Sequence, residues 1–149
     1  YAVECLEQNM MGEIYRYDQD ILQTIARFKG EIVTKDITAN SITHYLATNL
    51  KTVKRIRAAI EEKHPESRIQ VRKVAIVSAI GSDMKVPGIL SRAVTALSDA
   101  NISVLAMHQS MRQVDMQFVI DDENYNDAVK SLHRCLVEVH DHGKAICAA

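Results

Sequence analysis

Apolar and polar residues follow two patterns along the first half of the chain. Short alternating or β-branched stretches predict strands at 3–6, 31–39, 42–47 and 68–71. Between them, apolar residues recur every three or four positions, as in amphipathic helices, at Ile21, Leu22, Ile25 and Phe28 and at Val53, Ile56, Ala59 and Ile60. Gly30 is expected at the end of the first helix, and Asn49 is expected to cap the second. The predicted order is strand, helix, strand, strand, helix, strand.

The second half repeats this order. Residues 74–80 are apolar almost throughout, which predicts a strand covered on both faces. Pro87 is expected at the first position of the next helix, and Asp121 or Asp122 at the cap of the last one. The two helical stripes are Leu90, Ala93, Val94 and Leu97, and Tyr125, Val129, Leu132 and Leu136. The remaining strands are predicted at 102–107, 114–120 and 145–147.

The two halves therefore read as two copies of one unit. Ile21, Ile32 and Val53 align with Ile89, Ile102 and Val129 at a spacing of about 70 residues. We predict an α+β protein of two ferredoxin-like βαββαβ units, residues 1–73 and 74–149. Each unit would have an antiparallel sheet with helices on one face.

Composition narrows the possible functions. The chain has 149 residues, of which 47% are hydrophobic and 25% charged, and a formal net charge of −1. These values exclude a disordered chain and give no basic footprint for nucleic acid. No apolar run approaches the roughly 20 residues of a membrane span. Three scattered cysteines indicate reduced thiols in a cytoplasmic protein. Because the chain begins with Tyr1, we expect it to be part of a longer protein.

The sequence gives little support for a catalytic site or a metal site. The spacing of the candidate metal ligands fits no closed zinc pattern, and we expect no metal at His133, Cys135, His140, His142 and Cys147. No third group orients a cysteine–histidine pair, and no lysine follows a glycine-rich phosphate loop. Six methionines indicate core filling rather than a site.

RNA binding is an alternative, because ferredoxin-like sheets often bind RNA. A basic helix face supports it, made of Lys51, Lys54, Arg55, Arg57 and Lys63. Such sheets stack bases on aromatic side chains, however, and here only Tyr45 and Phe118 are candidates. We expect a solvated helix face instead.

Each predicted unit offers a place for a small anionic or zwitterionic ligand. The loop after the first strand ends at a helix N-terminus, where free N–H groups and the helix dipole favour a carboxylate. The second strand is an edge strand, which needs a partner. Pairing of edge strands from two copies would let an amino acid bind between loop and strand. Binding would then favour assembly.

The residues at these places resemble the ACT domain. The second half carries the most specific match, in residues 74–84, Pro87-Gly88, 96–104, and the strand and helix at 114–121 and 128–133. In the first half, residues 8–11 and 37–41 are similar to an "NM" loop and an "ITtSe" turn. Together these segments resemble the C-terminal regulatory region of aspartate kinases, across nearly the whole chain.

The resemblance implies a regulatory region with tandem ACT domains, which dimerises through sheet edges and binds an amino acid. The effector residues that it implies are Asn9, Met10, Gly12, Asn40, Ser82, Asp83, Met84, Pro87, Gly88 and Gln109. Gln109 is expected to contact either a ligand or another subunit. The family's catalytic lobe, which uses ATP and Mg²⁺, has no counterpart here, so this chain is expected to hold no catalytic residue and no cofactor.

One position departs from the family pattern. Lysine-inhibited relatives carry an acid early in the second strand, where this sequence aligns Lys35, or Asp36 after a shift of one residue. Because like charges repel, Lys35 opposes binding of a ligand ammonium group. A purely structural, effector-insensitive dimerisation module is therefore the second alternative.

Overall fold

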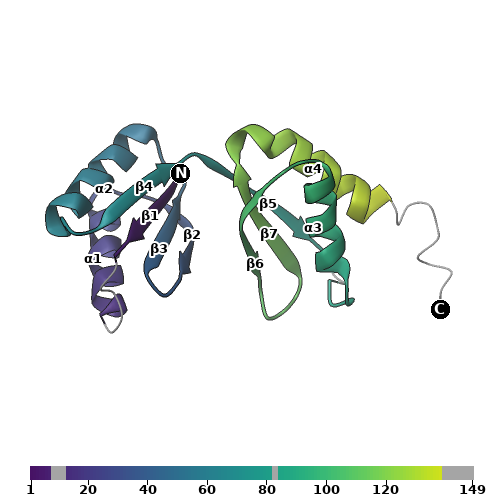
Figure 1. The fold of residues 1–149 in the computed structure, drawn as a ribbon, viewed down its shortest axis with the longest axis horizontal. Coiled ribbons are helices and arrows are strands. Elements are labelled where there is room, and N and C mark those ends of the chain that lie inside the picture. Colours follow the sequence, from purple (N-terminus) through teal and green to yellow (C-terminus); the bar gives the residue numbers. More distant parts are fainter. Residues whose placement is uncertain (8–12, 82–83, 139–149) are drawn as a thin grey trace. The chain divides into compact units, whose positions relative to one another are not determined.

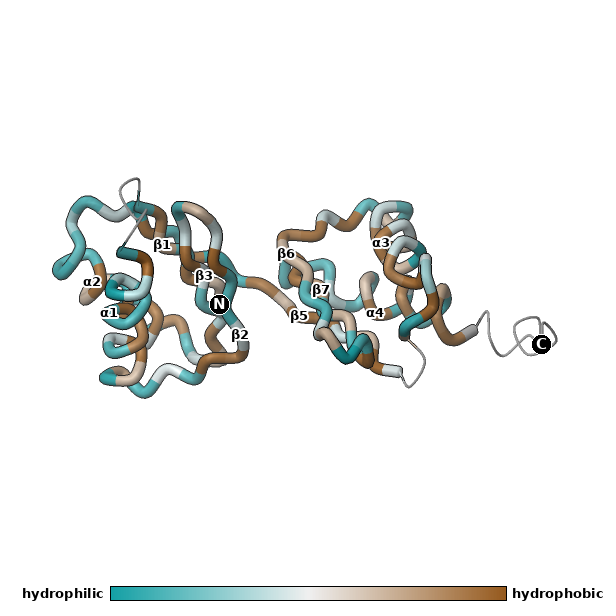
Figure 2. Tube along the Cα trace, turned by 90° about the horizontal axis from the view of Figure 1, so that it is seen from below, coloured by the Kyte–Doolittle hydropathy of each residue, from teal (hydrophilic) through white to brown (hydrophobic). Residues whose placement is uncertain are grey.

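Buried apolar side chains gather in two separate clusters, one in each half of the chain. The computed structural model describes residues 1–7, 13–81 and 84–138. The chain divides into two compact units, Tyr1–Lys73 and Val74–Ala149 (Figure 1). Within each unit, hydrophobic and hydrophilic residues alternate along strands and helices (Figure 2). This patterning gives each unit its own core.

The first unit is a four-stranded antiparallel sheet with two helices on one face (Figure 1). Its strand order is β2-β3-β1-β4. In chain order, the elements are β1 (Ala2–Leu6), α1 (Ile14–Arg27), β2 (Ile32–Ile37), β3 (Ser41–Leu46), α2 (Leu50–Lys63) and β4 (Arg68–Arg72). The order of elements and the antiparallel pairing confirm the predicted ferredoxin-like class.

Local sequence signals explain how these elements begin and end. The side chain of Asn49 caps α2 and accepts a hydrogen bond of 2.9 Å from the N–H of Thr52, as predicted. Glycine is needed at position 30 for a different reason from the one expected at a helix C-terminus. Lys29 takes the positive φ of 55° after α1, while a Cβ on Gly30 would lie 2.8 Å from Ile25 Cγ2. Gly30 therefore allows close packing rather than an unusual backbone angle.

The second unit repeats the arrangement, with a described sheet of order β5-β7-β6 and helices on one face. Its elements are β5 (Val74–Ile80), α3 (Ile89–Asp99), β6 (Val104–Gln109), β7 (Asp115–Asp121), the 3₁₀ helix η1 (Asp122–Asn124), α4 (Tyr125–His133) and the π-helix η2 (Arg134–Glu138). The strand expected at 145–147 lies outside the described residues.

The helix starts in the second unit differ from the prediction. Pro87 was expected at the first helical position, but α3 begins at Ile89 and Gly88 precedes it with a φ of 89°. Only glycine adopts this angle without strain, so the chain turns at Gly88 and Pro87 lies before the turn. Asp121 and Asp122 were expected to cap the last helix. Instead η1 intervenes, and α4 begins at Tyr125.

The prediction that β5 is covered on both faces is wrong for its end, because Ile80 is 81% exposed. The stripe predicted for the last helix is also only partly buried. Ala128 and Leu132 are in the core, whereas Tyr125 and Val129 are exposed. These side chains lie around the edge of β5 that faces away from β7, where the described sheet has no further strand.

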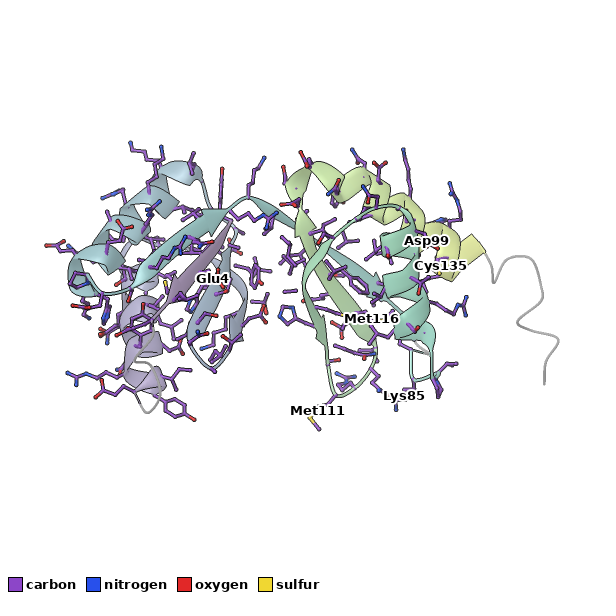
Figure 3. All side chains as sticks on the ribbon, in the orientation of Figure 1. Glu4, Lys85, Asp99, Met111, Met116 and Cys135 are labelled. Carbon is purple, nitrogen blue, oxygen red and sulfur yellow. The ribbon has the colours of Figure 1, made fainter. Side chains whose placement is uncertain are left out.

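The methionines do not all fill the cores. Met84 and Met116 are buried, but Met107 is half-exposed on the edge strand β6. Met111 extends into solvent from the β6–β7 hairpin, while Met116 lies in the sheet (Figure 3). Edge strands and hairpin tips receive little cover from the helices, so hydrophobic residues there stay accessible.

Candidate functional site

In the first unit, the end of β1 meets the turn between β2 and β3. The N–H of Glu7 donates a 3.0 Å hydrogen bond to the carbonyl of Asn40. The turn is closed by Thr38, whose Oγ1 accepts from the N–H of Ser41 at 3.1 Å. Of the predicted effector residues in this unit, Asn40 thus lies beside β1, at the start of the loop to α1. Asn9, Met10 and Gly12 lie outside the described residues.

Three polar side chains from α1, β2 and β3 meet under the edge of this sheet. Lys35 Nζ donates to Asp18 Oδ2 at 2.6 Å, and His44 Nε2 lies 3.4 Å from Asp18 Oδ1. His44 is fully buried, and burial lowers its pKa, although the Asp18 carboxylate opposes this change. At neutral pH the imidazole is therefore uncharged, and the cation of this cluster is Lys35.

Asp36 lies on the opposite face of β2, because successive side chains of a strand alternate. Its Oδ2 accepts a 2.7 Å hydrogen bond from the hydroxyl of Tyr45 on β3. Burial, together with this carboxylate, raises the pKa of Tyr45, so the phenol stays protonated. Lysine-inhibited relatives carry a ligand-facing acid at the position of Lys35 or Asp36. Here Lys35 is a cation, and the carboxylate of Asp36 accepts a hydrogen bond from Tyr45.

A second polar network lies between α1 and the connection from α2 to β4. The hydroxyl of Tyr17 donates to Ser67 Oγ at 2.6 Å, and Asp20 binds Lys63 Nζ at 2.6 Å. The hydrogen bond from Lys63 lowers the pKa of Asp20. Nearby, burial raises the pKa of the Cys5 thiol to about 12. Cys5 is therefore a protonated core residue and not a nucleophile.

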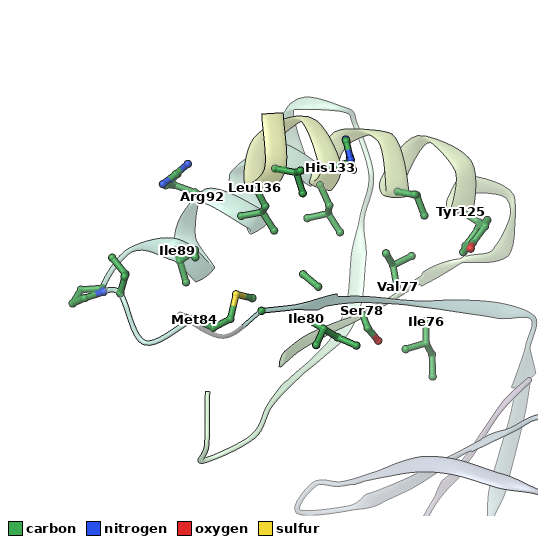
Figure 4. Close-up of a pocket in the computed structure, with 17 residues that line it drawn as sticks. Ile76, Val77, Ser78, Ile80, Met84, Ile89, Arg92, Tyr125, His133 and Leu136 are labelled. Carbon is green, nitrogen blue, oxygen red and sulfur yellow. The ribbon is translucent and has the colours of Figure 1, made fainter. Parts of the chain in front are cut away.

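In the second unit, the connection from β5 to α3 runs along a cavity of about 760 Å³ (Figure 4). The N–H of Gly81 donates to the carbonyl of Val114 at 3.0 Å, which fixes the start of this connection. Met84 is buried and points into the space between β5 and α4. Met84 and Pro87, both predicted effector residues, line the cavity, and Gly88 follows directly. Ser82 and Asp83 lie outside the described residues.

The side chains that line this cavity are mainly apolar. Among its described lining residues there is no acid, and the cation is Arg92, whose Nη2 donates to the carbonyl of Cys135 at 3.3 Å. The cavity can therefore surround an apolar side chain but offers no counter-charge to an ammonium group. Gln109, at the end of β6, does not line it. The predicted effector residues thus fall at separate places in the two units.

Three of the five basic residues that suggested RNA binding, Arg55, Arg57 and Lys63, have partners within the protein. Arg57 pairs with Glu61 at 2.7 Å, and Arg55 lies 5.0 Å from the ring centre of Phe28. Both aromatic candidates for base stacking, Tyr45 and Phe118, are buried. The basic face is therefore a solvated helix surface with internal partners.

The described residues are 1–7, 13–81 and 84–138. They contain no cluster of three or more histidine, cysteine or acidic residues that could hold a metal ion. No helix in this part of the chain has the length and apolar character needed to cross a bilayer.

Sequence reasoning missed Asp18 and His44 as members of a polar cluster. A signal for His44 was present. Ile42, His44 and Leu46 alternate along β3, which places a histidine at a core-facing position between two buried aliphatic residues. Asp18 gives no comparable signal, because its exposure depends on how α1 rests against β2.

Comparison with known proteins supports the resemblance. Residues 77–136 match the ACT domain family. The chain is 46% identical over its full length to aspartate kinase Ask_Ect of Stutzerimonas stutzeri, of which it spans 31%. The aspartate kinase of Clostridium acetobutylicum superimposes with a TM-score of 0.82 at 18% identity, covering 92% of this chain and 32% of that protein.

A separately solved regulatory subunit shares the same fold. The ligand-free regulatory subunit of aspartate kinase from Thermus thermophilus gives a TM-score of 0.70 at 13% identity, covering 91% of this chain and 92% of that one. The chain spans about a third of the curated relative it matches. Residues 77–136 therefore match the ACT domain family, and the chain as a whole is similar in sequence to an aspartate kinase and in fold to an aspartate kinase regulatory subunit.

Proposed function

We propose that this chain is the amino-acid-binding and dimerisation region of a cytoplasmic aspartate kinase. The observation that carries the proposal is the 46% identity to an aspartate kinase across all 149 residues. In this proposal, a catalytic lobe outside these residues binds ATP and Mg²⁺ and phosphorylates the carboxylate of L-aspartate for amino-acid biosynthesis. The chain itself supplies no catalytic residue and regulates that lobe.

Binding of an amino acid is the first part of the proposal to test. Calorimetric titration of the chain with lysine, threonine and methionine should give heat for at least one of them. Lysine is the least favoured, because Lys35 is a cation and the cavity of the second unit is lined, among its described residues, without an acid. Absence of heat for all three would favour the alternative of a structural module that has lost its effector sites.

Dimerisation through sheet edges is the second part. The edge strands β2 and β6 each carry a half-exposed hydrophobic residue, Ile37 opposite the buried Ile42 and Met107 opposite the buried Phe118. Such edges pair readily with another strand.

Charged substitutions test this pairing. We expect Ile37→Lys or Met107→Lys to weaken the dimer at least tenfold, because a lysine at the paired edge would have to be desolvated. Sedimentation velocity over a range of concentrations measures the effect. Arg57→Lys on the helix face is the control and should leave the association unchanged. If both edge variants associate like the original chain, the dimer uses another surface.

A further inference from the structure

The cluster of Asp18, Lys35 and His44 contains more polar atoms than its own contacts satisfy. Among the described residues, Asp18 Oδ1 and both ring nitrogens of His44 are buried without a hydrogen-bond partner. Buried polar atoms are normally satisfied, since leaving them unpaired costs free energy. A buried imidazole and a carboxylate that face each other at 3.4 Å are therefore suited to hold a donor rather than to stabilise the core alone.

The donor present in the structure is the ammonium group of Lys35. Its Nζ lies 2.6 Å from Asp18 Oδ2, which is the short distance of a charge-assisted hydrogen bond. The side chain of Lys35 is 36% exposed while that of Asp18 is 14% exposed. The ammonium group thus reaches inward from the solvent side of the edge strand to a carboxylate that is largely covered.

We propose that Asp18 and His44 form a binding site for a primary ammonium group, and that Lys35 occupies this site as a tethered ligand. Asp18 supplies the negative charge, and the buried neutral imidazole of His44, whose Nε2 lies 3.4 Å from Asp18 Oδ1, packs against the carboxylate. A tethered group acts at an effective concentration on the order of millimolar. Free amines and amino acids at lower concentrations are therefore kept out. The inference does not depend on the proposed kinase function.

Removal of the tethered group should open the site to an added amine. The test compares the 149-residue chain with its Lys35→Ala variant during thermal unfolding, with n-butylammonium chloride as the probe. Tetramethylammonium chloride at equal ionic strength is the control, because it carries the charge but has no N–H donor. We expect a saturable rise of a few degrees in the Tm of Lys35→Ala with n-butylammonium alone. The original chain should respond equally to the two salts.

Two further variants make the result specific to this site. Adding Asp18→Asn to Lys35→Ala should abolish the response, since the carboxylate is then gone. Lys35→Thr opens the same space with a residue that favours strands, and it should behave like Lys35→Ala if the alanine variant folds poorly.

An NMR titration of the His44 ring measures its pKa. This second measurement distinguishes binding at the site from a general change in stability. The Lys35 cation contributes to lowering the pKa of His44, so Lys35→Ala should raise that pKa and n-butylammonium should lower it again. Equal Tm responses in the original chain and Lys35→Ala, a response that survives Asp18→Asn, or a His44 pKa unmoved by the amine would each overturn the proposal.

Discussion

Replacing Phe118 with alanine should lower the free energy of unfolding by about 3–5 kcal/mol. Phe118 is fully buried at the centre of the second core and lies on β7, the strand between β5 and β6. Its removal leaves a cavity that the surrounding strands and helices cannot fill without moving. Urea unfolding followed by circular dichroism measures the change.

A matched substitution on the neighbouring strand is the control. It replaces an exposed hydrophobic residue with alanine and so tests whether burial causes the loss of stability. Ile80 lies at the end of β5 and is 81% exposed, so Ile80→Ala should change the free energy of unfolding by no more than about 0.5 kcal/mol. A large loss from Ile80→Ala, or a small one from Phe118→Ala, would show that the described core of the second unit is wrong.

The second large effect is a loss of stability in mild acid that depends on His44. Burial places the pKa of His44 below its ordinary value of about 6.5, so the unfolded chain binds a proton before the folded one does. The contribution of His44 is complete above about pH 6.5 and is lost as the pH falls toward the folded pKa. The loss should reach about 1.4 kcal/mol for each pH unit in that window.

The groups that face His44 are Asp18 from α1 and Lys35 from β2. In the His44→Leu variant, the free energy of unfolding should therefore fall less steeply between pH 7 and pH 5.5 than in the original chain. His133→Gln, which removes an exposed imidazole of α4, should keep the original slope. Equal slopes in all three proteins would contradict the burial of a neutral His44.

Hydrophobic periodicity predicted most elements of the fold, because burial decides where an amphipathic segment lies. Val53, Ile56 and Ile60 repeat with the period of a helix, and all three are in the first core. The residues that signal where a helix begins or ends were less reliable guides. Gly88, and not Pro87, sets the start of α3, because a glycine at positive φ lets the chain turn one residue later.

The candidate site was harder to predict than the fold. Family resemblance indicated the loop residues Met84 and Pro87, and these two do line one cavity. The Asp18–Lys35–His44 cluster depends instead on strand register and on the position of α1. Lys35 pairs with His44 across β2 and β3, a relation that no local pattern contains.

The exposed side chains beside β5 show what helical periodicity does not predict. Tyr125 and Val129 have the spacing of core residues, yet they are exposed beside the cavity. A helical stripe predicts which side chains face inward but not whether a neighbouring strand covers all of them. Covering depends on tertiary neighbours, which the spacing of one helix does not specify.

Sedimentation velocity of the chain with and without lysine, threonine and methionine tests most directly whether ligand binding and subunit pairing are coupled. At a protein concentration near the dimer dissociation constant, the amino acid that gives heat in calorimetry should change the weight-average sedimentation coefficient. The same amino acid should have a much smaller effect on whichever edge variant, Ile37→Lys or Met107→Lys, weakens the dimer. Sedimentation coefficients that stay unchanged with every amino acid, although one of them binds, would contradict a regulatory region that works through assembly.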